Sequence, residues 1–151
     1  MAAAHRDSIH ALGSRFYPPP VVEAWSAAVT PEIYASAMQA GEAFFIATGT
    51  IDGEAVVLGF ASHRPDDDED GASVYVRGSA ARRGLGSALL RRAEAHARAH
   101  DAASIAVQAS LAGVAFYRAN GFEEVGRGEA RLMTGASMEC VFMRKRLPPA
   151  A

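Results

Sequence analysis

The chain has little of what marks disulfide-bonded, metal-rich, membrane or nucleic-acid-binding proteins. Its one cysteine, Cys140, can form neither an intrachain disulfide nor a thiolate-rich metal site. The longest apolar runs, such as residues 43–47, are too short to span a bilayer, and the N-terminus lacks a signal peptide's apolar segment. The formal net charge of −2 provides no electrostatic footprint for nucleic acid or an anionic membrane. We therefore expect a soluble, cytoplasmic protein with no metal, nucleic-acid or membrane partner.

The composition is that of a folded globular protein. The chain has 151 residues, of which 50% are hydrophobic and 21% are charged. A chain of this length buries about two-thirds of its unfolded surface, so it needs no metal or disulfide to fold. We expect one domain over residues 1–151.

The first forty residues predict helices. Apolar residues recur at helical spacing over 9–16 and again over 22–29, on either side of a proline run. Thr30 and Pro31 are typical of a helix start, with the hydroxyl as N-cap, and Gly41 of a helix end.

The rest of the chain alternates strands and helices. Two strands, 43–51 and 56–62, flank a hairpin turn at Asp52-Gly53, and the acidic run 66–71 is expected to be a solvated loop. The remaining expected elements are strands at 74–76, 105–107, 122–127 and 138–146 and helices at 85–100 and 113–119. Hairpins followed by strands separated by helices indicate an α/β (α+β) fold: a mixed, mostly antiparallel sheet with helices on both faces.

The segment VYVRGSAARRGLGSALL, from Val74 to Leu90, is the most informative part of the sequence. A strand runs into a glycine-containing turn that opens directly into a helix. Gly84 and Gly86 have no Cβ atom, so the backbone there can approach a ligand closely. The first N–H groups of the helix lack intrahelical partners and lie at the positive end of the helix dipole. Together they form a cradle for a phosphate or pyrophosphate, although a tight turn without a ligand would use the same glycines.

Two common phosphate-binding motifs do not fit this segment. No Gly-Lys-Ser/Thr follows the glycines, so it is not a P-loop. A dinucleotide-binding fingerprint needs three glycines early in a repeated βαβ unit, whereas hairpins come first here.

Three motifs, in order and at matching spacing, resemble the GNAT superfamily of acyl-CoA N-acyltransferases. The family's strand and phosphate motif match Val74-Tyr75-Val76 followed by residues 81–86. Its Phe-Tyr-x-x-x-Gly-Phe motif matches residues 116–122, and its Val-Gly-Phe strand resembles residues 57–60. The resemblance covers roughly residues 43–147 and implies acetyl-CoA as co-substrate.

The resemblance also implies which residues form the site. Tyr117 stands where the family has a tyrosine that acts as general acid toward the CoA thiolate, although it could be a core tyrosine instead. The expected acetyl-CoA-binding residues are Val74, Tyr75, Val76, Ala81, Arg82, Arg83, Gly84, Leu85, Gly86, Ser87, Ser110 and Phe116. The two arginines could contact phosphates or simply begin a solvated helix. The backbone N–H of Val76 is the expected donor to the thioester oxygen.

Several positions depart from the family pattern. Ala81 replaces the family's Gln or Arg, Gly78 replaces a proline, and Ser73 stands where many members carry a catalytic Glu. No strand is predicted before Ile9, so either the chain begins after the family's first strand or the sheet lacks that edge. The strand at 43–50 would then be a bare edge, which we expect the N-terminal segment or a second chain in a homodimer to cover.

The sequence does not identify the general base. His63, Glu42, Glu139 and a water held by backbone carbonyls are all candidates, and His63 is expected to be a surface histidine at a strand end. His96 and His100 have a spacing that can bind zinc, but no further ligand is evident in the sequence.

Three functions remain open. The leading hypothesis is an N-acetyltransferase that moves an acetyl group from acetyl-CoA to an unidentified primary amine. A non-catalytic acyl-CoA-binding or regulatory module is the alternative, because Ala81 and Ser73 depart from the family. The third is another kind of nucleotide-binding protein.

Overall fold

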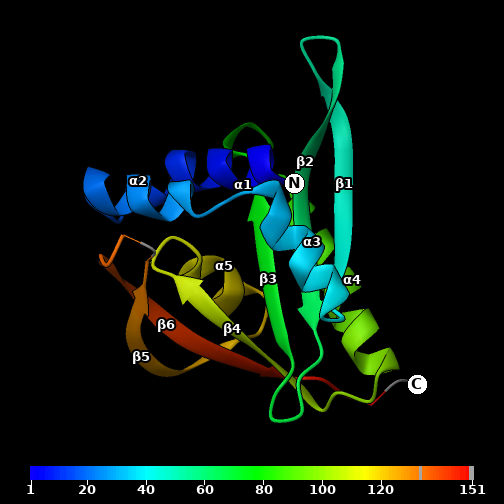
Figure 1. Cartoon of the computed structure of the whole chain (residues 1–151). Helices are drawn as coiled ribbons and strands as arrows, with labels where there is room; N and C mark the ends of the chain where they lie inside the picture. The colour runs from blue at the N-terminus through cyan, green and yellow to red at the C-terminus, as the bar shows by residue number, and fades with distance from the viewer. Residues whose placement is uncertain (133, 150–151) are drawn as a thin grey trace.

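The fold combines one twisted sheet with helices packed against both of its faces (Figure 1). The computed structural model describes residues 1–132 and 134–149. The helices are α1 (Ala2–Ser8), the π-helical turn η1 (Ile9–Gly13), α2 (Pro19–Ala27), α3 (Pro31–Gln39), the 3-10 turn η2 (Gly78–Ala80), α4 (Leu85–Ala99) and α5 (Val114–Ala119). The strands are β1 (Ala43–Ile51), β2 (Glu54–Arg64), β3 (Gly71–Val76), β4 (Ser104–Ser110), β5 (Glu123–Arg131) and β6 (Ser137–Arg146).

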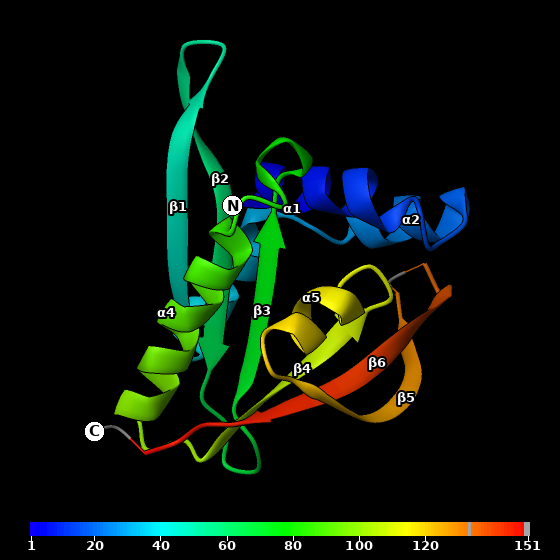
Figure 2. The same ribbon diagram turned by 180° about the vertical axis from the view of Figure 1, so that it is seen from behind.

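The six strands lie in the order β1-β2-β3-β4-β6-β5. All neighbours are antiparallel except β3 and β4, which run parallel. Helices α1, α2 and α3 cover one face, and α4 and α5 cover the other (Figures 1 and 2). The predicted fold class is therefore confirmed. In the described residues no strand precedes β1, which lies at the edge of the sheet, as the sequence predicts.

Alternation along the strands sorts apolar side chains between the two faces. Phe44, Phe60 and Tyr75 pack with residues of α1, α2 and α3 in one buried cluster. Their neighbours Ala61 and Val74 pack with α4 on the other side. Each face of the central strands is thus covered by its own layer of helices.

β3 and β4 are neighbours at one end only. Within the described residues their one registered pair is Gly71 with Ala106, beside a hydrogen bond from Ala106 N–H to the carbonyl oxygen of Asp70 (2.8 Å). Beyond this pair the two strands move apart, and α5 lies in front of the opening (Figure 2). The sheet therefore contains an internal gap that is bounded by two strand edges.

Local signals in the sequence account for most element boundaries. Asp52 and Gly53 both have positive φ (51° and 80°), as a tight hairpin turn requires, so the predicted turn is confirmed. Gly41 ends the α3 region with φ of 97°. Thr30 is the N-cap of α3, but its hydroxyl makes no capping hydrogen bond, so that detail of the prediction is wrong.

The acidic run is not simply a solvated loop. Glu69 pairs with Arg144 and Asp70 with His63, while Gly71 already belongs to β3. His63 is fully buried, with Nε2 2.6 Å from Asp70 Oδ2 and Nδ1 2.8 Å from His96 Nδ1. The expectation of a surface histidine is therefore wrong, because α4 covers the end of β2 and two polar partners make burial tolerable.

Candidate active site

The turn between β3 and α4 leaves backbone amides free at the helix start. Gly84 is the N-cap of α4 with no side-chain capping bond, and the first intrahelical bond runs from Ala88 N–H to Gly84 O (3.0 Å). The amides of Leu85, Gly86 and Ser87 therefore point out of the helix without an intrahelical partner. Arg82 and Arg83 are both exposed beside them. Free amides, a helix dipole and two guanidinium groups make this end of α4 attractive to an anion.

The two glycines of the turn serve different purposes. Gly84 has φ of 81°, and a Cβ atom there would point into open space, so a ligand can approach its backbone. A Cβ atom on Gly86 would instead lie 3.0 Å from the ring of Phe116 and 3.6 Å from the side chain of Val76. The close approach of a ligand to the backbone, which the sequence predicts at both glycines, is therefore possible at Gly84. Gly86 instead lets α4 pack closely against α5 and β3.

The turn is anchored to α1 and to β2. Gly78 N–H donates to Asp7 Oδ2 (2.8 Å), and Arg77 Nε donates to the carbonyl oxygen of Val57 (2.7 Å). A Cβ atom on Gly78 would lie 2.5 Å from that of Ala11. This close approach explains why a glycine replaces the family's proline here.

The edge of β3 that faces the gap carries amides without strand partners. Arg77 N–H donates to Leu58 O (2.8 Å), and Tyr75 pairs with Phe60 across β2. Because donors alternate along a strand, the amides of Val74 and Val76 point the other way, toward the gap. Val76 therefore has the orientation that the family resemblance expects of a donor to a thioester oxygen.

Tyr117 reaches this edge from α5. Its side chain is 6% exposed within the cluster around β4 and β6. Burial, and then the neighbouring Tyr75, raise the pKa of Tyr117 far above its ordinary value, and a hydrogen bond with the backbone of Val74 opposes this only in part. The phenol is therefore neutral at any physiological pH.

The other expected site residues lie on the elements that border the gap, although not all of their side chains face it. Ser110 ends β4 opposite Cys140 of β6, and the ring of Phe116 lies between α5 and Gly86. The side chain of Tyr75 faces away from α4 and α5, toward α1, and burial raises its pKa to about 12. Ala81 is partly buried and follows η2, so it provides backbone but no charge.

Two of the candidate bases lie at the end of the sheet where β3 begins, away from the end that carries the proposed site. His63 and Glu42 are at the end of the β1–β2 pair where β3 begins, opposite the end that carries Val76. His63 does complete a histidine cluster, with ring centroids 5.0 Å from His96 and 6.0 Å from His100, although the sequence shows no partner for those two. Across the described residues no three His, Cys, Asp or Glu side chains are placed to hold a metal ion.

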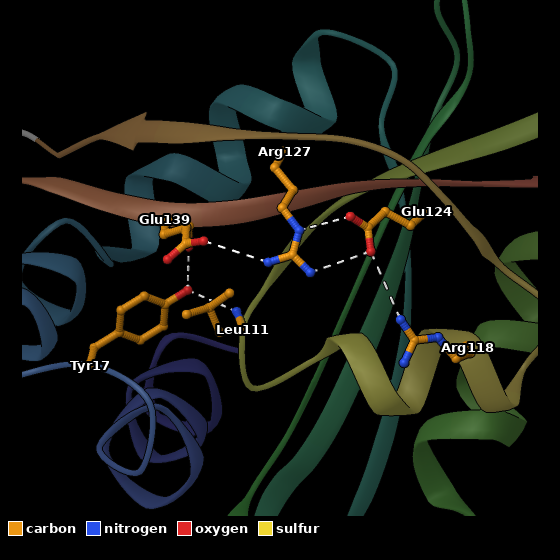
Figure 3. A network of polar contacts seen from close by, with 6 residues as sticks. All are labelled: Tyr17, Leu111, Arg118, Glu124, Arg127 and Glu139. Atoms are coloured by element: carbon orange, nitrogen blue, oxygen red, sulfur yellow. Dashed lines mark hydrogen bonds and ion pairs between the residues drawn. The ribbon is translucent and has the colours of Figure 1, made fainter.

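Glu139, the third candidate base, takes part in a surface network (Figure 3). Its carboxylate lies 3.6 Å from Arg127 Nη1, and Arg127 also donates to Glu124 (2.8 Å). The Glu139 carboxylate is thus already engaged in an ion pair at the surface. We therefore set Glu139 aside as the base.

Tyr17 is a site residue that the sequence does not reveal. Its hydroxyl donates to the carbonyl oxygen of Glu139 (2.5 Å) and accepts from Leu111 N–H (2.8 Å), as Figure 3 shows. It thereby ties the segment between η1 and α2 to the end of β4 and to β6. Tyr17 follows the helical pattern immediately and precedes three prolines, but nothing in that pattern predicts a long-range partner.

Comparisons with known proteins agree with this arrangement. A family model described as an acetyltransferase (GNAT) domain matches residues 40–124. The chain belongs to the GNAT acetyltransferase family. A search of curated proteins found no match.

Solved structures of acetyltransferases share the fold. A GCN5-related N-acetyltransferase from Rhodopseudomonas palustris is 29% identical over 97% of this chain and 87% of that chain, with a TM-score of 0.81. The ribosomal-protein-alanine N-acetyltransferase of Brucella melitensis is 22% identical over 97% and 91%, with a TM-score of 0.66. The PaiA N-acetyltransferase of Thermoplasma acidophilum, solved with coenzyme A, is 17% identical over 96% and 89%, with a TM-score of 0.67.

Membership of this GNAT family supports acyl transfer from an acyl-CoA as the general activity. No helix in residues 1–132 and 134–149 is long and apolar enough to cross a membrane.

Proposed function

We propose that the chain is an N-acetyltransferase that transfers the acetyl group of acetyl-CoA to a primary amine by direct attack. The observation that carries this proposal is the gap between β3 and β4, which the amide of Val76 faces and where the neutral phenol of Tyr117 lies beside the backbone of Val74. We treat residues 1–151 as one catalytic domain and the amine as a small-molecule or protein amine of unknown identity.

Acetyl-CoA fits the two features of the site that are open. Its pyrophosphate would lie on the amides of residues 84–87, with Arg82 and Arg83 adding positive charge. Its pantetheine arm would run along β3 in the gap and hydrogen-bond the strand edge as an added strand does. Ala81 and Ser110 would flank the two ends of that arm.

The chemistry then follows from where charge develops. As the amine attacks the thioester carbon, negative charge builds on the carbonyl oxygen, and Val76 N–H would donate a hydrogen bond that stabilises it. The C–S bond then breaks and leaves a thiolate. A CoA thiol has an ordinary pKa near that of cysteine, about 8.5, well below that of the buried phenol. Tyr117 therefore acts best as a hydrogen-bond donor that stabilises the leaving sulfur.

A panel of amines tests the proposal directly. Release of free CoA from acetyl-CoA, followed as thiol, should accelerate at least tenfold over the amine-free rate with one or more members of the panel. Mass spectrometry of that amine should show the added acetyl group. Binding of acetyl-CoA without thiol release for any amine would instead favour a non-catalytic acyl-CoA-binding module, the candidate that Ser73 motivates.

A further inference from the structure

One buried polar atom has no role in the site as described so far. His5, on α1, is 8% exposed, and its Nδ1 lies 2.8 Å from the hydroxyl oxygen of Tyr34. Its Nε2 is the single buried side-chain nitrogen or oxygen in the described residues that lacks a hydrogen-bond partner. Such atoms are rare in folded proteins because an unpaired buried polar group is destabilising, and they occur where a water or a reacting group completes them.

The ring of His5 lies against the strand that carries the site. Its centroid is 3.6 Å from that of Tyr75 in a tilted stack, and it meets Phe60 edge-on at 5.8 Å. Tyr75 stands between Val74 and Val76, whose amides face the gap. His5 and Tyr117 therefore approach consecutive residues of β3 from opposite faces of the sheet, one from α1 and the other from α5.

The surroundings of His5 keep its ring uncharged. Burial, and then the positive charges of Arg6 and the N-terminus, lower its pKa to about 4. The other titratable groups that face it are the hydroxyls of Tyr34 and Tyr75, which burial keeps protonated. If Nδ1–H donates to the Tyr34 oxygen, Nε2 carries a free lone pair that can accept a proton.

We propose that His5 is the proton acceptor for the attacking amine, taking the proton on Nε2 directly or through one bound water. The inference rests on the proposed acetyl transfer. The amine nitrogen forms the new N–C bond as the C–S bond breaks, and its surplus proton passes to Nε2. The electron pair of the broken bond stays on sulfur, and the imidazolium then returns the proton to the thiolate or to solvent.

The choice of His5 has a further support in the order of the layers. α5 lies on one face of the sheet at the gap and α1 lies on the other (Figures 1 and 2), and in this proposal the acceptor amine approaches from the α1 face. His5 is on that face, whereas His63 and Glu42 are at the far end of β2 and Glu139 is paired with Arg127.

His5→Phe is the central test, because phenylalanine keeps the ring stacked on Tyr75 and removes both nitrogens. With an amine that the wild type accepts, kcat should fall at least 100-fold, within the range typical of a lost base. The Kd of acetyl-CoA should change less than twofold, and the Tm at pH 7.5 should not fall. The matched control is His10→Phe, five residues on, whose exposed ring bonds Ser26 (3.0 Å) and which should keep wild-type kcat.

Chemical rescue separates a proton acceptor from a packing residue. His5→Ala leaves space for a ring, so added imidazole should restore kcat in proportion to its neutral fraction as the pH rises. His5→Gln provides a second polar replacement, with the same expected loss of kcat, should phenylalanine prevent folding.

Wild-type kcat in His5→Phe, or loss of kcat in His5→Ala that imidazole fails to restore at any pH, would overturn the inference while the proposed function stands. A wild type that binds acetyl-CoA but acetylates no amine would overturn the proposed function, and this inference with it.

Discussion

At the scale of single residues, the site combines two neutral side chains whose burial shifts their pKa in opposite directions. Burial raises the pKa of Tyr117 and lowers that of His5 to about 4. In both cases the uncharged form is favoured, because desolvation penalises charge whatever its sign. A neutral phenol can donate a hydrogen bond, and a neutral imidazole can accept a proton. Burial thus keeps both groups in the neutral form that their proposed roles require.

Tyr117→Phe should lower kcat by about 100-fold, toward the lower end of the effect of a lost acid or base. The substitution keeps the ring in its cluster and removes only the hydroxyl, so the free energy of unfolding should change by about 1 kcal/mol or less. The Kd of acetyl-CoA, measured by calorimetry, should stay within twofold of the wild type. Unchanged turnover with an accepted amine would remove Tyr117 from the mechanism.

The depressed pKa of His5 also predicts how stability depends on pH. Between about 4 and 6.5 the unfolded state binds a proton at His5 that the folded state does not, so the free energy of unfolding rises with pH. Acidification from pH 6.5 to 4 should therefore cost roughly 3 kcal/mol at this residue.

Urea unfolding at several pH values measures this dependence, and His5→Phe is the comparison. The variant should lose most of the slope but keep the part due to His96, whose pKa is also lowered by burial and by its histidine neighbours. Equal slopes in the two proteins would show that His5 is not buried as described.

At the scale of elements, the turn between β3 and α4 contains two residues with positive φ, Arg82 (63°) and Gly84 (81°), and Gly84 is the N-cap of the helix. Gly84 and Gly41 form a matched pair, since both have positive φ (81° and 97°) and neither would place a Cβ atom within 4 Å of another group. Gly41 lies after α3, away from the turn. An alanine at either position brings the same backbone strain. Only at Gly84 would it also obstruct a bound ligand.

Gly84→Ala should weaken acetyl-CoA binding at least tenfold, or about 1.4 kcal/mol, because the new methyl group occupies the approach to the free amides. Gly41→Ala should lower the free energy of unfolding by about 1 kcal/mol and leave the affinity for acetyl-CoA unchanged. Calorimetric titration of both variants makes the comparison. Equal affinities would place the pyrophosphate elsewhere.

Much of the fold could be predicted from short-range signals, and the departures have physical causes. Asp52-Gly53 and the apolar stripe of α4 are local features, and the elements they predict are confirmed. The burial of His63 depends on Asp70 and on His96, which lie seven and thirty-three residues away. No local pattern contains that information.

The same distinction applies to the site. Gly84 and Tyr117 stand in motifs that can be matched by spacing. His5 lies one helical turn before Ile9 on the apolar face of α1, which is a visible but weak signal, since a histidine there can simply fill a core. Its importance depends on the missing partner of Nε2, which only the three-dimensional structure reveals.

At the scale of the whole molecule, the sheet has two outer edges, β1 and β5, and the sequence-based expectation concerns the edge formed by β1. In the described residues β1 pairs only with β2, and α1 lies on a face of the sheet, so the N-terminal segment does not pair with this edge. Ile46 on β1 is 49% exposed. A bare strand edge with an exposed apolar side chain favours association.

We expect a second copy of the chain to cover this edge. Sedimentation equilibrium of the wild type should show a dimer at micromolar concentration, and Ile46→Lys should shift it to monomer, because a charge on an edge strand opposes pairing. Glu54→Lys, on the neighbouring strand at the hairpin, is the control for added positive charge. A monomeric wild type at about 100 μM would contradict the expectation.

The single registered pair between β3 and β4 has a consequence for how the molecule opens. It divides the sheet into two hydrogen-bonded ladders, β1-β2-β3 and β4-β6-β5, each continuous in itself. Lys145 on β6 and Glu94 on α4 (2.7 Å), together with Tyr17, are polar links between these halves. The two ladders can therefore behave as separate cooperative units in native-state hydrogen exchange. A molecule that fills the gap would merge them into one, and amides on both inner edges would then exchange at a common, slower rate.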